Sequence, residues 1–141
     1  MSLGLALDVA GTLEVQVATG SMRPWFGPGT TLRIRSVVPR EPLLRRVVVA
    51  VDDSGRQLAH RVVRDERDVD GTLLLRGDAS KGSERITEAD VIGVVTAIRV
   101  RGRWVSVEEV PRPLRHSVTW LGRQWVMAPW RLRRVWTRAL A

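Results

Sequence analysis

Between residues 12 and 110 the chain alternates apolar and polar residues over short stretches, as in TLEVQVAT at 12–19 and TTLRIRSVV at 30–38. Such alternation is typical of half-buried β-strands, because successive side chains of a strand point to opposite faces. Further strands are expected at 43–53, 58–66 and 71–78, and two more at 90–110 around a turn at 101–103. The sequence therefore predicts a fold that is all or mainly β.

The pattern changes after residue 110, where two prolines interrupt the strand-like segments. Apolar residues then recur at helical spacing near the end of the chain, at Leu132, Val135, Trp136, Ala139 and Leu140. We expect residues 1–110 to form a β domain. Residues 111–141 are expected to form a tail with a basic amphipathic helix, preceded by a second helix around 117–127.

Positive charge is concentrated in this tail. The net charge is +8, and residues 111–141 contain seven arginines and no acidic residue, which leaves a balance of +1 for residues 1–110. The chain has no cysteine and only two histidines, so disulfides, a thiolate zinc site and a histidine-rich metal cluster are excluded. We expect neither a metal nor another cofactor.

No apolar run approaches the roughly 20 residues that a transmembrane helix needs. The longest runs are only a few residues, such as VVVAV at 47–51. The first twenty residues include Asp8 and Glu14 and lack the basic start of a secretory signal. The sequence therefore predicts a cytoplasmic protein without a transmembrane segment, free or peripherally attached to a membrane.

One stretch, ATGSMRPWFGPGT at 18–30, holds too many prolines and glycines for a strand and is expected to form a stiff turn that positions Ser21. A serine hydroxyl becomes a nucleophile when a base within hydrogen-bond reach takes its proton. The possible bases are Lys81, His60 and His116. His60 lies within a predicted strand and His116 beyond the prolines, so we pair Ser21 with His60. The other interpretation of His60 is a partly exposed strand residue.

The segment TGSMRP, followed 39 positions after Ser21 by HRVV and then by LLRGDAS and ADVIGVV, resembles the type I signal peptidase family. It is similar in particular to the endoplasmic-reticulum and archaeal branch, which has histidine where most bacterial members have lysine. The resemblance covers roughly residues 14–96. It implies a signal-peptidase-like catalytic β fold and a serine endopeptidase that cleaves a precursor or leader peptide.

The resemblance also implies roles for individual residues. Ser21 is the nucleophile, and His60 is the general base that later protonates the leaving amine. The Ser21 N–H and the Thr19 hydroxyl would form the oxyanion hole. Gly20 and Met22, on either side of Ser21, are expected to contact the substrate, and Gly20 would let the substrate backbone approach closely.

The third catalytic residue has two candidates. Asp78 falls on the Gly-Asp motif of the family and is expected to orient His60, as the acid does in a serine triad. In the family the orienting acid can also follow that motif, near Glu84 in this chain. A further interpretation is that Asp78 is a turn residue that binds its own backbone. Lys81 lies away from the lysine position of bacterial members and is expected to be a solvated loop residue.

Signal peptidases normally carry an N-terminal membrane anchor, and none is expected in this chain, so its substrates need not be secretory precursors. The tail contains four tryptophans among its arginines: Trp120, Trp125, Trp130 and Trp136. We expect them to bind an anionic membrane surface in place of the anchor, with Trp25 and Phe26 reaching the same surface. In the other interpretation the tail packs its tryptophans on the β body. Nucleic acid is disfavoured as a partner.

The main partner expected is therefore a peptide or precursor-protein substrate. A second class of function is a catalytically inactive module that holds an extended peptide in the same groove by strand addition. An autoprotease of the phage-repressor type is disfavoured, because those proteins use a lysine base and carry a DNA-binding domain.

Overall fold

The computed structural model describes residues 6–7, 10–23 and 25–107 of the chain. The described strands are β1 (Thr12–Gln16), β2 (Thr31–Arg35), β3 (Val47–Val51), β4 (Gln57–Glu66), β5 (Thr72–Arg76), β6 (Glu84–Thr87), β7 (Val91–Val100) and β8 (Arg103–Ser106). Two short helical segments, α2 (Arg67–Asp70) and η1 (Glu88–Asp90), connect strands. The expectation of a mainly β protein is confirmed for this part of the chain. None of its helices combines the length and apolar character needed to cross a membrane.

The predicted tail helices and their four tryptophans lie outside the described residues, as does the expected boundary at residue 110.

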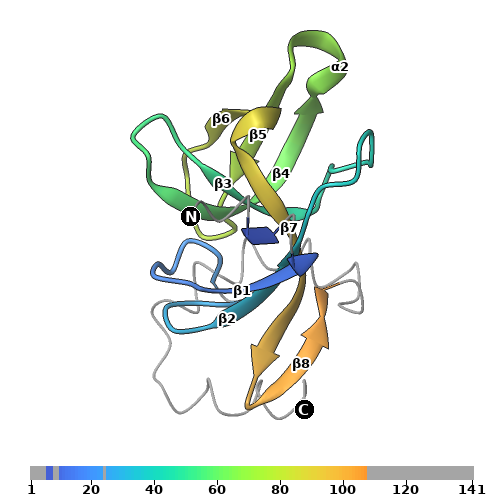
Figure 1. The fold of residues 1–141 in the computed structure, drawn as a ribbon. Coiled ribbons are helices and arrows are strands. Elements are labelled where there is room, and N and C mark those ends of the chain that lie inside the picture. The colour runs from blue at the N-terminus through green and yellow to red at the C-terminus, as the bar shows by residue number, and fades with distance from the viewer. Residues whose placement is uncertain (1–5, 8–9, 24, 108–141) are drawn as a thin grey trace.

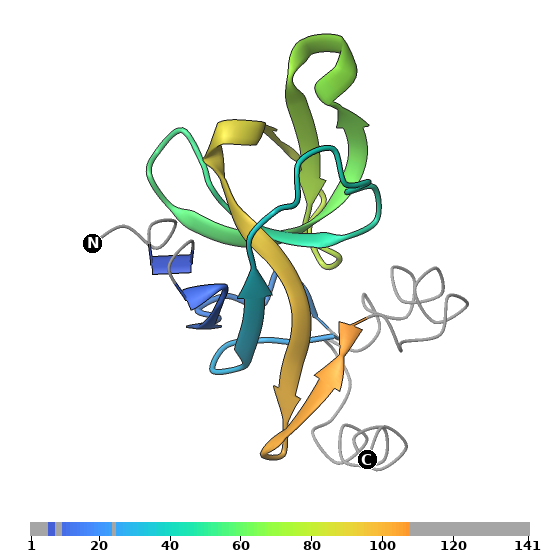
Figure 2. The same ribbon diagram turned by 45° about the vertical axis from the view of Figure 1, so that its right-hand side comes forward.

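The strands form one antiparallel sheet with the order β1-β2-β7-β3-β4-β5-β6, and β8 pairs with β7. Figure 1 shows β3 to β6 gathered in one half of the molecule and β1, β2 and β8 in the other. The long strand β7 runs through both halves, and its curvature is clear in Figure 2. The register shifts at residues 33/34 and 49/50, where β2 and β3 meet β7. Such bulges bend a sheet.

Two hydrophobic clusters lie on opposite sides of β3. Val47 and Val49 belong to the first cluster, whereas Val48 and Ala50 belong to the second. Since neighbouring side chains of a strand point to opposite faces, β3 is buried on both faces, and this explains its unbroken apolar sequence. The first cluster also takes side chains from the turn after β1, so the core holds the segment that carries Ser21.

The strand boundaries differ from the expected ones in two instructive places. β3 begins at Val47 rather than at residue 43, because the preceding residues form a turn in which the Arg46 N–H donates to the Leu43 carbonyl at 2.9 Å. Arg45 in this turn has a φ of 69°, in the left-handed region. β6 was not expected at all. It has four residues with one buried side chain, Ile86, too few for a recognisable alternation.

Candidate functional site

Ser21 lies in the turn that follows β1, and buried neighbours hold this turn in place. Met22 is 1% exposed and Phe26 is 6% exposed, and both belong to the first hydrophobic cluster. The Arg23 N–H donates a hydrogen bond of 3.1 Å to the Gly20 carbonyl, which closes the chain tightly around Ser21. The described residues of this stretch therefore form a turn rather than a strand, as the sequence indicated.

A second loop, which follows β5, packs directly against Ser21. The Ala79 N–H donates to the Ser21 carbonyl at 2.8 Å, and the Asp78 N–H lies 3.4 Å from the Met22 sulfur. Gly77 is buried, and a β-carbon there would lie 2.6 Å from the Ser21 carbonyl oxygen. The backbone of Ser21 is thus held by two loops that are far apart in the sequence.

His60 is a buried polar residue in the middle of β4, with 6% of its surface exposed. Its Nε2 lies 2.9 Å from Ser21 Oγ, and its Nδ1 lies 3.0 Å from Glu84 Oε2. A carboxylate accepts hydrogen bonds, so Nδ1 is the donor in the contact with Glu84, and in a neutral imidazole it is then the nitrogen that carries the proton. Nε2 is then free to accept a hydrogen bond from the Ser21 hydroxyl. The three side chains form a hydrogen-bonded series with the order of a serine triad.

The register of the sheet brings Glu84 to His60. Glu84 pairs with Leu75 of β5, and Leu75 pairs with Val62 of β4. Directly paired residues of an antiparallel sheet present their side chains on the same face. Val62 and His60 are two positions apart in β4, so they also share that face. Glu84 is therefore brought to the imidazole by β6, a strand that the apolar and polar pattern of the sequence does not indicate.

Asp78 does not bind His60, and the expectation that it orients the imidazole is corrected. Its carboxylate instead binds the Arg61 guanidinium through two contacts, at 2.9 Å from Nε to Oδ1 and 2.7 Å from Nη2 to Oδ2. Arg61 follows His60 in β4 and points to the opposite face. Arg61 also donates to the Arg45 carbonyl at 3.0 Å. The contacts of Asp78 with Arg61, and of Arg61 with Arg45, therefore connect the loop after β5, strand β4 and the turn before β3. Of the two candidate acids, Glu84 is the one that contacts His60.

The other residues expected in the site are divided between the site and the core. Thr19 is exposed, and its Oγ1 lies 3.2 Å from Ser21 Oγ. Gly20 lies against the Arg23 side chain, whose Nε would be 3.0 Å from a β-carbon at this position. Met22 is too deeply buried for its side chain to meet a substrate, so that expectation was wrong. The alternation of apolar and polar residues ends before this turn, so the sequence pattern does not indicate that the Met22 side chain points into the core.

The aromatic residues that follow Ser21 also differ from expectation. Phe26 lies in the core, so it does not offer its ring to a membrane surface. Trp25 is half-buried and packs against the first cluster. Its indole N–H is buried and has no hydrogen-bond partner within the described part of the chain.

The polar groups gathered at Ser21 are two hydroxyls, one imidazole and one carboxylate, from Thr19, Ser21, His60 and Glu84. This set can move a proton from a hydroxyl to an imidazole and back. Within the described ranges there is no group of three or more His, Cys, Asp or Glu residues that could hold a metal ion. Comparison with protein-family models, with curated proteins and with solved structures finds no match for this chain.

Proposed function

We propose that this chain is a serine endopeptidase of the signal-peptidase type, with Ser21 as nucleophile and His60 as general base. The observation that carries the proposal is the 2.9 Å contact between Ser21 Oγ and His60 Nε2, with Glu84 3.0 Å from the opposite ring nitrogen. The sequence resemblance of TGSMRP and HRVV to that family supports the same two residues. Glu84 takes the orienting role that we first assigned to Asp78.

The reaction follows from this arrangement in two stages. Ser21 Oγ attacks the carbonyl carbon of the peptide bond while His60 Nε2 takes the hydroxyl proton. Glu84 stabilises the imidazolium through Nδ1. His60 then gives the proton to the leaving amine as the C–N bond breaks, which leaves an acyl ester on Ser21. A water molecule deprotonated by His60 hydrolyses this ester and restores the free hydroxyl.

Two donors support the negative charge that develops on the carbonyl oxygen. The Ser21 N–H makes no hydrogen bond to any other residue that the structure describes. The Thr19 hydroxyl lies 3.2 Å from the attacking oxygen. Loss of one such donor in an oxyanion hole costs about 100- to 1,000-fold in kcat.

The test is cleavage of a peptide library, read by mass spectrometry, with the wild type and the Ser21→Ala and His60→Ala variants. We expect cleavage at defined bonds by the wild type and none by the two variants. Ser83→Ala is the matched control, because it removes an exposed serine hydroxyl one residue before Glu84. It should cleave the same bonds as the wild type.

The same experiment distinguishes the alternative function. If the wild type cuts nothing beyond what Ser21→Ala cuts, although peptides bind to both, the chain is a peptide-binding module rather than an enzyme. Cleavage that persists in both variants would mean that another group carries the reaction.

A further inference from the structure

Three cationic residues belong to the two segments that meet at Ser21, and we refer to Arg23, Arg76 and Lys81 as the site cations. Arg23 lies two residues after the nucleophile, and Arg76 directly precedes Gly77, the glycine that packs on Ser21. Lys81 follows Ser80, whose N–H donates to the Gly77 carbonyl at 2.9 Å. Arg76 and Lys81 are exposed, and Arg23 is half-buried.

The site cations have no acidic partner in the described part of the chain. The two nearest acids of the site are already engaged, since Asp78 binds Arg61 and Glu84 binds His60. Elsewhere in the sheet arginines pair with carboxylates: Arg33 with Glu14, Arg35 with Glu41, Arg67 with Asp65 and Arg85 with Glu66. The carboxylates of the described residues therefore leave the charge of the site cations uncompensated.

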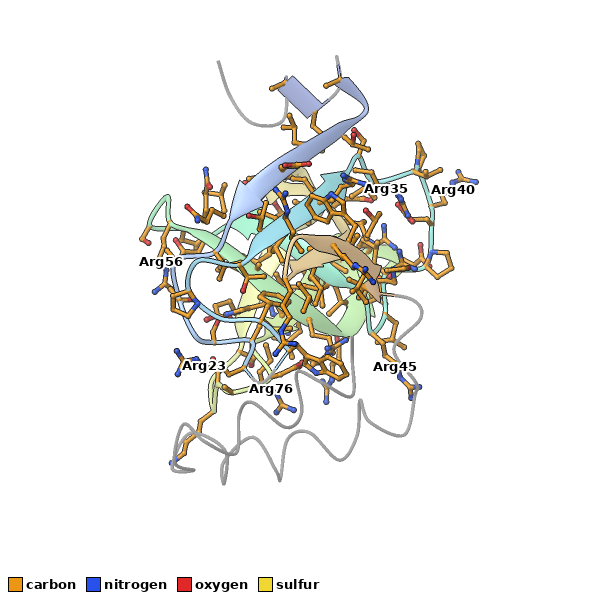
Figure 3. All side chains as sticks on the ribbon, turned by 90° about the horizontal axis from the view of Figure 1, so that it is seen from below. Arg23, Arg35, Arg40, Arg45, Arg56 and Arg76 are labelled. Atoms are coloured by element: carbon orange, nitrogen blue, oxygen red, sulfur yellow. The ribbon has the colours of Figure 1, made fainter. Side chains whose placement is uncertain are left out.

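The Arg23 side chain lies against two glycines. A β-carbon on Gly20 would lie 3.0 Å from Arg23 Nε, and one on Gly27 would lie 3.1 Å from the same atom. The side chain thus lies in a space that exists because both residues lack a β-carbon. In Figure 3 Arg23 and Arg76 lie on the same side of the molecule, whereas Arg40 lies on the other.

We propose that the site cations select a peptide substrate with acidic residues close to the cleaved bond. This inference rests on the proposed peptidase function and names its substrate class. An extended peptide rises about 3.3 Å per residue, so side chains within roughly four residues of the bond come within reach of the site cations. A carboxylate at one of these positions forms a charge-assisted hydrogen bond with a guanidinium or ammonium group. Unpaired cations beside the nucleophile also draw acidic segments toward the site.

A peptide fits this surface better than an anionic membrane does. Peripheral membrane binding combines cations with apolar side chains that enter the lipid. The apolar side chains beside Ser21 point into the core instead, since Met22 is 1% exposed and Phe26 is 6% exposed. Among the described residues the exposed large apolar side chains are Val38, Leu44 and Val69, and none of them adjoins a site cation in the sequence.

The experiment compares two peptides that contain a bond cleaved by the wild type and differ only in carrying aspartate or asparagine near it. The wild type is assayed for kcat/KM, and Ser21→Ala is assayed for binding by fluorescence anisotropy. Both are repeated in the Arg23→Gln/Arg76→Gln/Lys81→Gln background. Arg40→Gln is the matched control, because it removes an exposed arginine on the other side of the molecule.

We expect the aspartate peptide to be favoured by about two- to fivefold per acidic residue, the usual range for exposed charge pairs. The preference should fall as the salt concentration is raised from about 0.05 to 0.5 M. It should disappear in the triple variant and persist in Arg40→Gln. A Gly27→Ala variant should weaken the preference while it keeps every charge, because it displaces Arg23.

Other outcomes separate this inference from the proposed function. Equal cleavage of both peptides by the wild type overturns the inference and leaves the peptidase intact. A preference that survives in the triple variant overturns it as well. Absence of any cleavage overturns the proposed function. Preferential binding of the aspartate peptide by Ser21→Ala would then support only the binding of acidic peptides by the site cations. A further outcome would favour an anionic membrane as the partner of the site cations. In it, the wild type and Arg40→Gln float with phosphatidylglycerol vesicles, the triple variant does not, and neither peptide is preferred.

Discussion

Gly77 and Ser21 are in close backbone contact, and a β-carbon at residue 77 would lie 2.6 Å from the Ser21 carbonyl oxygen and 2.9 Å from the Ser21 β-carbon. Real β-carbons essentially never come so close to other atoms. The contact joins the loop after β5 to the turn after β1. It is supported by the 2.8 Å hydrogen bond from the Ala79 N–H to the same Ser21 carbonyl. The position of the proposed nucleophile therefore depends on a glycine 56 residues away.

Gly77→Ala should lower both stability and activity. The added methyl group must push the Ser21 turn and the loop after β5 apart, and overpacking of this kind costs about 1–3 kcal/mol. Urea denaturation measures the stability, and the rate of peptide cleavage measures the displacement of the nucleophile. Gly82→Ala in the same loop is the control, because no atom lies within 4 Å of its β-carbon position. Similar unfolding midpoints and rates for the two variants would contradict the proposed contact.

Separate substitutions of Glu84 and Asp78 should have different effects, one on the catalytic rate and the other on the stability of the fold. Glu84→Gln removes the charge that faces the imidazolium, and we expect kcat to fall by about 100-fold or more. Asp78→Asn weakens a bidentate pair with Arg61, whose side chain is 16% exposed, and should cost roughly 1–3 kcal/mol of folding free energy. Rates measured below the unfolding transition distinguish these effects. A larger loss of kcat in the Asp78 variant would reverse our assignment.

Met22→Ala should destabilise the fold, although Met22 adjoins the nucleophile. Truncation of a buried methionine usually costs about 2–5 kcal/mol, and Met22 is 1% exposed. Thermal or urea unfolding provides the measurement. Val69→Ala, at a position that is 86% exposed, should change the stability by less than about 0.5 kcal/mol. A Met22 variant with wild-type stability and an altered cleavage preference would restore Met22 to the substrate-binding surface.

The β3–β4 turn should show a defined pH dependence. The Ser54 hydroxyl, the Arg56 N–H and other groups of the turn bind the Asp52 carboxylate and lower its pKa to about 2. Because the pKa is lower in the folded than in the unfolded chain, Asp52 stabilises the fold above the ordinary pKa of 3.8. That contribution is lost as the pH falls from about 4 through about 2.

Carboxyl NMR titration of the wild type and of Ser54→Ala checks this dependence. The pKa of Asp52 should rise in the variant, since the Ser54 hydroxyl is the largest cause of the lowered value. The acid-induced loss of stability should then be smaller and should be complete at a higher pH than in the wild type. An unchanged Asp52 titration in Ser54→Ala would show that the Ser54 N–H and the Arg56 contacts hold the carboxylate without the Ser54 hydroxyl.

The sequence by itself determined the local features of this protein. Alternation of apolar and polar residues indicated most of the strands, because side chains on successive residues of a strand face opposite sides. The β-branched segment at 43–53 indicated a strand, although its burial on both faces was seen only in the structure. The cluster of prolines and glycines at 18–30 indicated a turn, and the scarcity of possible bases singled out His60 as the partner of Ser21. Each of these conclusions depends on residue types and short-range spacing.

Only the tertiary structure decided which side chains meet. The choice between Asp78 and Glu84 depends on the register of β4, β5 and β6, and β6 is too short to be seen in the pattern. The burial of Met22 depends on a cluster assembled from distant strands. A residue's neighbours along the chain set its preferred backbone conformation, whereas its contacts are set by strand pairing and loop packing between residues that are far apart in sequence. Local pattern therefore predicted most of the strands and the Ser21 turn but not the acid that completes the candidate site.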